Sequence, residues 1–252
     1  MAQMDGKVAL VTGAGSGIGR ASALAFAAEG ASVVVADVDA VGAARTVQLI
    51  AEPGGTATFV QADVAQAGEV EALVAQAVAT YHRLDYAFNN AGVPGPRAPT
   101  VDWTESDWDQ TVSVNLKGVW LCMKHEIAHM VERGGGAIVN ISSIGGLAGL
   151  PNASVYAACS HGVIGLTKSA ALEYAQAGVR INAVCPGVIR TPMIEKMTGG
   201  KPEVEARMAG MQPLGRMGQA EEIARAVVWL CSDAASFITG VALPADGGRA
   251  AG

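Results

Sequence analysis

The chain has 252 residues, of which 50% are hydrophobic and 16% are charged, against roughly 25% charged in an average soluble chain. This composition excludes a disordered chain and allows a large buried core. The 17 basic and 23 acidic residues give a net charge of −6 without any basic block, so we expect neither nucleic acid nor an anionic membrane as a partner.

The sequence carries no membrane or disulfide signal. The longest apolar runs fall far short of the roughly 18 to 20 residues that a membrane span needs. We also expect no secretory signal, because no charged region followed by an apolar stretch is visible at the start of the sequence. The four cysteines lack CxxC spacing, so we expect no metal site and no disulfide, but reduced thiols in a cytoplasmic protein. They are Cys122, Cys159, Cys185 and Cys231.

Short apolar runs alternate with helical stretches along the chain. In chain order the pattern predicts strand 7–12, helix 18–29, strand 31–37, strand 56–61, helix 68–81, strand 84–89, helix 104–132, strand 137–141, helix 154–176, strand 180–184, helix 220–232 and strand 237–243. Continuous apolar strands between helices indicate an α/β fold, a doubly wound parallel sheet with helices on both faces. No linker interrupts the alternation, so we expect residues 1–252 to form a single domain.

Residues 190–217 break this alternation. They contain three prolines and five of the nine methionines, and a long insertion after a strand's carboxyl end is a common place for a lid. The methionines are Met193, Met197, Met208, Met211 and Met217. Flexible thioethers suit an adaptable apolar pocket, so we interpret this segment as a substrate-binding flap. Ordinary packing of a mobile flap against the body remains the alternative.

A glycine-rich turn follows the first predicted strand and opens the first predicted helix. It fits the pattern T-G-x-x-x-G-x-G through Gly13, Gly17 and Gly19. Such glycines make a tight turn, admit a pyrophosphate to the backbone and direct a helix N-terminus at it. The turn therefore predicts dinucleotide binding, and we include Ser16 and Ile18 in the binding set.

The end of the second predicted strand indicates which dinucleotide binds. A carboxylate at Asp37 can accept hydrogen bonds from both ribose hydroxyls of NAD and would repel the 2′-phosphate of NADP. Only Arg20 and Arg45 are cations within conceivable reach, so we expect NAD. Asp63 and Val64 end the third strand, where the carboxylate could hold the adenine amino group. A helix cap is the alternative for Asp63.

Further motifs carry a resemblance to a known family. They are residues 89–92 (Asn-Asn-Ala-Gly), Ser143 and Tyr156 thirteen positions apart, and residues 186–191 (Pro-Gly-Val-Ile-Arg-Thr). With the glycine-rich turn, they resemble the classical short-chain dehydrogenases/reductases over residues 6–248. The resemblance implies a Rossmann-type sheet of about seven strands, usually a homotetramer, in which NAD(P) exchanges hydride with a carbonyl or an alcohol.

The same resemblance implies roles for individual residues. Ser143 would polarise the substrate oxygen, Tyr156 would be the general acid/base, and Asn115 would hold a proton-relay water. A capping serine and a packing tyrosine are the alternatives for the first two. Further implied cofactor contacts are Asn90, Ala91, Gly92, Tyr156, Pro186, Gly187, Ile189 and Thr191. The implied substrate contacts are Val93, Ser143, Tyr156, Gly187 and Met193.

One position departs from the family pattern Tyr-x-x-x-Lys: Ser160 stands where the lysine would follow Tyr156. That lysine binds the nicotinamide ribose and depresses the tyrosine pKa. A tyrosine with the ordinary pKa of about 10 is only about one-thousandth ionised at pH 7. His161 points to another side of the helix and Lys168 is too far along it to substitute. Ser160 shares the face of Tyr156 and could bind a ribose hydroxyl or a relay water, so we keep it among the catalytic residues.

These observations favour an NAD-dependent oxidoreductase that interconverts a secondary alcohol and a ketone, with catalysis weakened at Ser160. The alternatives are an NAD-binding protein with a non-redox site and an inactive variant of a dehydrogenase. Apolar residues near the implied site, with Arg97 as the one candidate clamp for an anion, suggest a neutral, largely apolar or cyclic substrate. Broad apolar faces on helices 104–132 and 154–176 favour assembly into a homotetramer.

Overall fold

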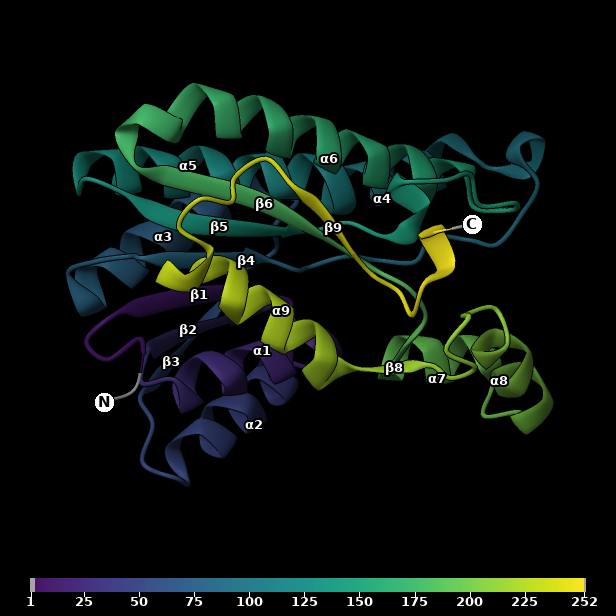
Figure 1. Cartoon of the computed structure of the whole chain (residues 1–252), viewed down its shortest axis with the longest axis horizontal. Coiled ribbons are helices and arrows are strands. Elements are labelled where there is room, and N and C mark those ends of the chain that lie inside the picture. Colours follow the sequence, from purple (N-terminus) through teal and green to yellow (C-terminus); the bar gives the residue numbers. More distant parts are fainter. Residues whose placement is uncertain (1–2, 252) are drawn as a thin grey trace.

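A seven-stranded parallel sheet in the order β3-β2-β1-β4-β5-β6-β9 forms the centre of the computed structural model, which describes residues 3–251 (Figure 1). Its strands are β1 (Val8–Thr12), β2 (Ser32–Asp37), β3 (Ala57–Gln61), β4 (Tyr86–Asn89), β5 (Gly136–Ile141), β6 (Val179–Pro186) and β9 (Ala242–Ala245). The strand order reverses direction between β1 and β4, which places a ligand crevice at the carboxyl ends of these strands.

Helices cover both faces of the sheet (Figure 1). One face carries α1 (Gly17–Ala28), α2 (Ala40–Ala51) and α9 (Ala220–Cys231); the other carries α3 (Ala67–Tyr81), α4 (Glu105–Val112), α5 (Val119–Glu132) and α6 (Ser154–Tyr174). Alternate side chains of β1 serve the two faces: Ala9 and Val11 pack with α1 and α9, whereas Val8 and Leu10 pack with α3 and α5. The predicted doubly wound α/β fold is confirmed.

The structure differs from the prediction at three places. Helix α2 lies where no helix was predicted, and the Asp39 side chain caps it by accepting a 3.1 Å hydrogen bond from the Val41 N–H. The predicted helix 104–132 is divided by a π-helical segment, Ser113–Gly118, between α4 and α5. The predicted strand 237–243 is wrong in its first half, because Phe237 is fully exposed and Gly240 turns the chain with a φ of +77° before β9 begins.

The segment 190–217 is mostly helical. Helices α7 (Pro192–Thr198) and α8 (Pro202–Ala209) each begin with a proline at the first helical position, where the missing N–H costs nothing. Two-residue strands, β7 (Ile189–Arg190) and β8 (Gly218–Gln219), pair with each other and join the ends of the segment. The segment therefore projects from this two-stranded base beyond the carboxyl end of the sheet (Figure 1).

Candidate functional site

Two adjoining cavities form a cleft at the carboxyl ends of the strands. One has a volume of about 330 Å³ and extends along the glycine-rich turn, and the other, of about 170 Å³, lies over the ends of β5 and β6. Both are lined by Ile18, Asn90, Ala91, Gly92, Val93, Thr191 and Met193. A ligand that extends from one cavity into the other would therefore contact the predicted cofactor residues along its length.

The glycine-rich turn has no room for a side chain at Gly13. Gly13 has a φ of +63°, and a Cβ added there would lie 2.9 Å from the Asn90 side chain. Asn90 braces the turn by donating from Nδ2 to the carbonyls of Thr12 (3.0 Å) and Gly13 (3.1 Å). The side chain of Ser16, at the N-cap of the 12-residue helix α1, makes no capping hydrogen bond. The first N–H groups of α1 are thus free to bind an anion such as a pyrophosphate.

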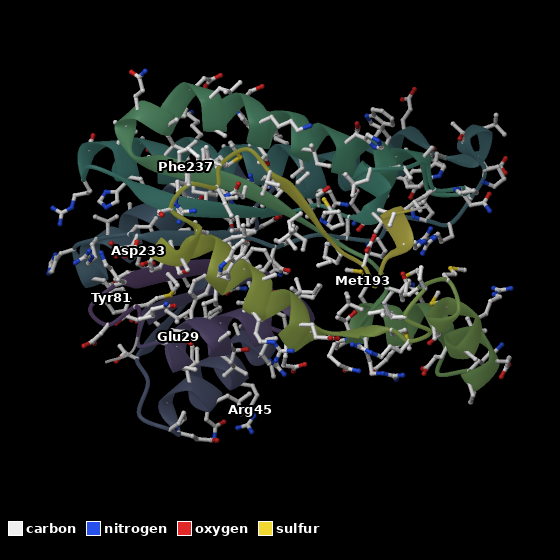
Figure 2. All side chains as sticks on the ribbon, viewed as in Figure 1. Glu29, Arg45, Tyr81, Met193, Asp233 and Phe237 are labelled. Atoms are coloured by element: carbon white, nitrogen blue, oxygen red, sulfur yellow. The ribbon has the colours of Figure 1, made fainter. Side chains whose placement is uncertain are left out.

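The carboxylate of Asp37 is held at the far end of this turn. Its Oδ2 accepts a 2.7 Å hydrogen bond from the Gly15 N–H and its Oδ1 accepts a 2.8 Å hydrogen bond from the Asp39 N–H. Arg20 uses its Nε and Nη2 donors on Thr46 Oγ1 and on backbone carbonyls. Arg45 pairs with Glu52 at 3.2 Å and lies on the outer side of the molecule (Figure 2). Neither arginine forms an ion pair with Asp37 among the described residues.

Asp63 and Val64 both line the larger cavity. The Asp63 side chain accepts a 2.9 Å hydrogen bond from the Ala65 N–H, and the N-cap of α3 is Gln66. The alternative of a helix cap at Asp63 is therefore wrong.

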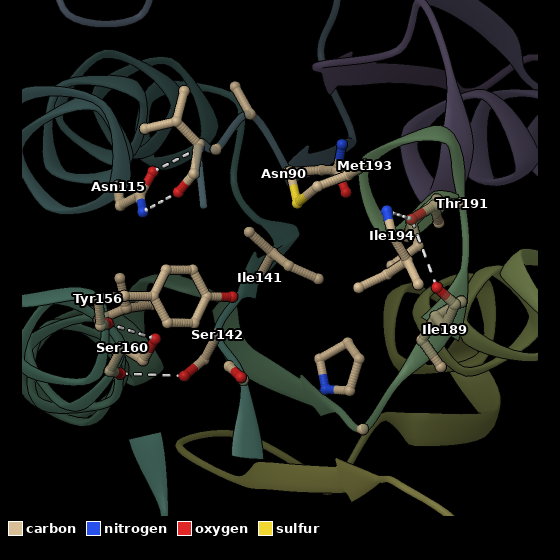
Figure 3. A pocket seen from close by; sticks show the side chains of 18 residues that line it. Asn90, Asn115, Ile141, Ser142, Tyr156, Ser160, Ile189, Thr191, Met193 and Ile194 are labelled. Carbon is tan, nitrogen blue, oxygen red and sulfur yellow. Dashed lines mark hydrogen bonds between the residues drawn. The ribbon is translucent and has the colours of Figure 1, made fainter. Parts of the chain in front are cut away.

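Ser143 and Tyr156 both line the smaller cavity, and Figure 3 shows the Tyr156 side chain there. Ser143 follows β5, and its Oγ accepts a 3.1 Å hydrogen bond from the Gly145 N–H, which leaves its own proton free to be donated into the cavity. Tyr156 lies in the first turn of α6 and points its phenol into the cavity. Burial raises the pKa of Tyr156, and hydrogen bonding by Ser143 and the charge of Arg97 lower it in part.

Ser160 lines the same cavity one helical turn beyond Tyr156. Its hydroxyl donates a 2.9 Å hydrogen bond to the Tyr156 carbonyl, and its lone pairs can still accept from a ribose hydroxyl or a water. The His161 ring lies 2.9 Å from the Ala157 carbonyl, outside the cavity lining. None of the 18 described residues that line this cavity carries a charged side chain.

Asn115 lies in the π-helical segment and lines the cavity. Its Oδ1 accepts from the Val93 N–H and its Nδ2 donates to the Val93 carbonyl, both at 2.8 Å. The side chain therefore holds the loop after β4 in place. A hydrophobic pattern carries no signal for this contact, because the π-helical turn does not alter which residues are apolar.

The remaining predicted residues are also brought to the cleft. Pro186, Gly187, Ile189 and Thr191 line it from the end of β6 and the base of the flap. Of the five methionines in residues 190–217, Met193, the one expected to contact substrate, is among the lining residues, on α7 at the edge of the cleft (Figure 2). Met217, by contrast, is buried at the far end of the flap.

Sequence reasoning missed two features of the site. Thr12 Oγ1 accepts hydrogen bonds from the N–H groups of Asn90 (3.0 Å) and Ala91 (3.2 Å), and the threonine of the T-G-x-x-x-G-x-G pattern was the available signal. Glu126 is fully buried behind the site and accepts a 2.9 Å hydrogen bond from Asn89 Nδ2. Burial raises the pKa of Glu126 to about 7. No pattern singled out this glutamate on α5.

Two negative findings concern metal and membrane. Residues 3–251 contain no group of three or more His, Cys, Asp or Glu side chains placed to hold a metal ion. No helix within the same residues combines the length and the apolar character that crossing a membrane would require.

Known proteins match this chain over nearly its whole length. The family described as Enoyl-(Acyl carrier protein) reductase matches residues 13–250. The cyclohexanol dehydrogenase of Acinetobacter sp. (strain SE19) is 46% identical, over 97% of this chain and 95% of that protein. A 2,5-dichloro-2,5-cyclohexadiene-1,4-diol dehydrogenase of Sphingobium indicum is 43% identical, over 98% of both chains. The crystal structure of levodione reductase superposes with a TM-score of 0.96 at 40% identity and covers 98% of this chain and 99% of its own.

Proposed function

Because the chain belongs to the short-chain dehydrogenase/reductase family, we propose that it is an NAD-dependent oxidoreductase that interconverts a secondary alcohol and a ketone. One observation carries the proposal: the Tyr156 phenol and the unused proton of Ser143 face the same cavity at the end of the cofactor cleft. The names of the relatives, a cyclohexanol dehydrogenase and a cyclohexadienediol dehydrogenase among them, favour a cyclic substrate.

The residues of the chain supply the proton chemistry. When bound, the nicotinamide cofactor supplies hydride transfer to or from the substrate carbon. Ser143 donates a hydrogen bond to the substrate oxygen, and Tyr156 gives that oxygen a proton in reduction or takes one in oxidation. Oxidation requires an ionised phenol, whereas reduction requires a neutral one. Asn115 positions the loop that carries Val93 at the cavity wall.

The Asp37 carboxylate supports NAD over NADP as the cofactor. Its oxygens are fixed by backbone N–H groups, and each keeps a lone pair that can accept from a ribose hydroxyl. A 2′-phosphate would meet this negative charge, with Arg20 and Arg45 both bonded elsewhere. Asp63 and Val64 would then contact the adenine at the same end of the cleft.

The lining of the smaller cavity supports a neutral, largely apolar or cyclic substrate. Val93, Gly187 and Met193 would contact it together with Ser143 and Tyr156. In this proposal residues 1–252 are one dinucleotide-binding domain, and residues 190–217 are the flap that covers the substrate. Thr191, Met193 and Ile194 are the flap residues that line the cavity (Figure 3).

We also propose that the alcohol-oxidising direction is weak near neutral pH. Burial raises the pKa of Tyr156, and no cation lines the cavity to counter it among the described residues. The same observation favours the second candidate, an NAD-binding protein whose site performs no redox chemistry.

Two measurements separate these candidates. The first is the initial rate with cyclic secondary alcohols and ketones, measured with NAD or NADP from about pH 7 to about pH 10. We expect turnover in the oxidising direction to increase with pH. Binding of the reduced cofactor, followed by its fluorescence, should be similar in the protein and in Tyr156→Phe, while the variant loses turnover. Tight cofactor binding without any turnover in either direction would refute the redox proposal.

Large apolar side chains left on the surface support a homotetramer. Trp120 on α5 is 45% exposed and Leu172 on α6 is 85% exposed. Phe237, before β9, is fully exposed (Figure 2). Light scattering on the purified protein should give four times the mass of one chain. A monomer at micromolar concentration would contradict this assembly.

A further inference from the structure

Two serine hydroxyls at the floor of the smaller cavity have no proton left for a ligand. Ser142 Oγ donates a 3.0 Å hydrogen bond to the Ser160 carbonyl, and Ser160 Oγ donates a 2.9 Å hydrogen bond to the Tyr156 carbonyl. A hydroxyl has one proton and two acceptor lone pairs. Toward the cavity, both side chains can therefore act only as hydrogen-bond acceptors.

Ser142, Ser160 and Tyr156 all line the smaller cavity (Figure 3). Ser160 is one helical turn beyond Tyr156 on α6, and Ser142 faces them from the end of β5. Ser142 is 7% exposed and Ser160 is 5% exposed, so bulk water does not solvate their free lone pairs. Ser143, in contrast, accepts from Gly145 and still has its proton, which it can donate to the Tyr156 phenol.

This part of the cavity contains no positive charge. Arg97 and Cys159 are the other titratable groups that influence the Tyr156 phenol, and neither lines the cavity. Arg97 lies in an exposed loop, and Cys159 is buried on α6. An ionised phenol next to two oxygen acceptors, without a cation, is electrostatically unfavourable in a buried position.

We propose that the space between Ser142, Ser160 and Tyr156 binds a small cation with N–H groups, either ammonium or a primary alkylammonium. Its N–H groups can donate to both serine hydroxyls and to the phenolate, which forms charge-assisted hydrogen bonds. An anion would face only lone pairs, and a divalent metal ion would lack the carboxylate ligands that it prefers. The consequence for turnover rests on the proposed redox function, whereas binding itself does not.

The test uses the cofactor-free protein, so that its result does not depend on turnover. Tyrosinate absorbance is titrated in the protein and in Tyr156→Phe, and the difference isolates Tyr156. The titrations are run in methylammonium chloride and, at equal ionic strength, in tetramethylammonium chloride, whose cation has no N–H. We expect methylammonium to increase the tyrosinate fraction of Tyr156 below its midpoint about tenfold or more, with saturation, and tetramethylammonium to have no such effect.

Variants locate the cation at the hydroxyls. The double variant Ser142→Ala with Ser160→Ala should lose most of the methylammonium effect. In Ser160→Lys, Tyr156 should ionise more readily without the amine and should no longer respond to it. Equal titrations in the two salts, or an undiminished response in the double variant, would overturn the proposal. A response to sodium chloride as large as that to methylammonium would also overturn the proposal, because a positive charge without N–H groups would then be enough to bind.

Discussion

Ser142 and Ser143 are adjacent in the chain, but their hydroxyls have opposite hydrogen-bonding roles. Ser143 Oγ accepts from the Gly145 N–H at 3.1 Å, whereas Ser142 Oγ donates to the Ser160 carbonyl at 3.0 Å. Only Ser143 therefore has a proton for a substrate oxygen. We expect Ser143→Ala to lower kcat about 100-fold or more, as the loss of a donor to a developing charge does in other enzymes. Ser142→Ala should cost less than about tenfold, since no donor to the substrate is lost. Equal losses in steady-state rates would contradict this division.

Ser160→Lys should restore a charge beside Tyr156. An ammonium within a few ångströms lowers a tyrosine pKa, so we expect alcohol oxidation near pH 7 to rise about 10- to 100-fold. The pH dependence of kcat, followed through the absorbance of the reduced cofactor, should move to lower pH. His161→Lys is the matched control, because its position points away from the cavity lining. An unchanged rate in Ser160→Lys would show that the missing charge does not limit turnover.

Asp37→Ser should relax the choice of cofactor. Removing the carboxylate takes away both the acceptors for the ribose hydroxyls and the repulsion of a 2′-phosphate. We expect KM for NAD to rise and KM for NADP to fall, each about tenfold. Asp39→Asn, which removes a nearby charge but retains an oxygen to cap α2, should leave the NAD/NADP ratio nearly unchanged. A similar change in both variants would mean that the overall negative charge of this region, and not the Asp37 contact, sets the preference for NAD over NADP.

Glu126→Gln should change how stability depends on pH. Burial raises the pKa of Glu126 from 4.5 to about 7, so the folded protein binds this proton more tightly than the unfolded chain. The stabilisation is complete below about pH 4.5 and is lost as the pH rises to about 7, by about 3 kcal/mol in total. Denaturant unfolding at several pH values should show this decline in the protein and a flatter curve in Glu126→Gln. The exposed Glu132→Gln at the end of α5 is the control and should retain the decline.

Arg97→Gln should make Tyr156 harder to ionise. The Arg97 charge lowers the Tyr156 pKa, and the Ala98 N–H, bonded to the Asn152 carbonyl at 3.1 Å, ties its loop to the start of α6. The variant should shift the ascending limb of the oxidation pH profile to higher pH, while Arg97→Lys should restore it. A profile that is the same in all three proteins would exclude an electrostatic effect of Arg97 on the phenol.

The sequence predicted the strands of the sheet well because each is a continuous apolar run. It did not predict the division of 104–132, since the π-helical turn is paired with a contact between Asn115 and Val93, which lie 22 positions apart. It also extended the last strand too far. Residues 237–241 are β-prone, but the ladder with β6 begins only where Ala242 pairs with Ala183.

The candidate site shows the same limit at the level of atoms. The glycine-rich turn, Asp37, Ser143 and Tyr156 could be found by spacing, because the order of strands and helices brings such positions to one edge of a sheet. Four of the five methionines in residues 190–217 lie outside the cavity lining, since composition cannot tell which side of a short helix faces a cavity.

By itself, the sequence determined the fold class, the dinucleotide cleft and the absence of a lysine at position 160, because periodicity, glycine spacing and residue type are local properties. Only the tertiary structure decided which hydroxyls can donate. The proton of Ser142 goes to a carbonyl 18 residues away and the proton of Ser160 to a carbonyl on its own helix, whereas Ser143 keeps its proton. A hydroxyl's role depends on the partner that lies within 3 Å of it, and that partner is fixed by packing.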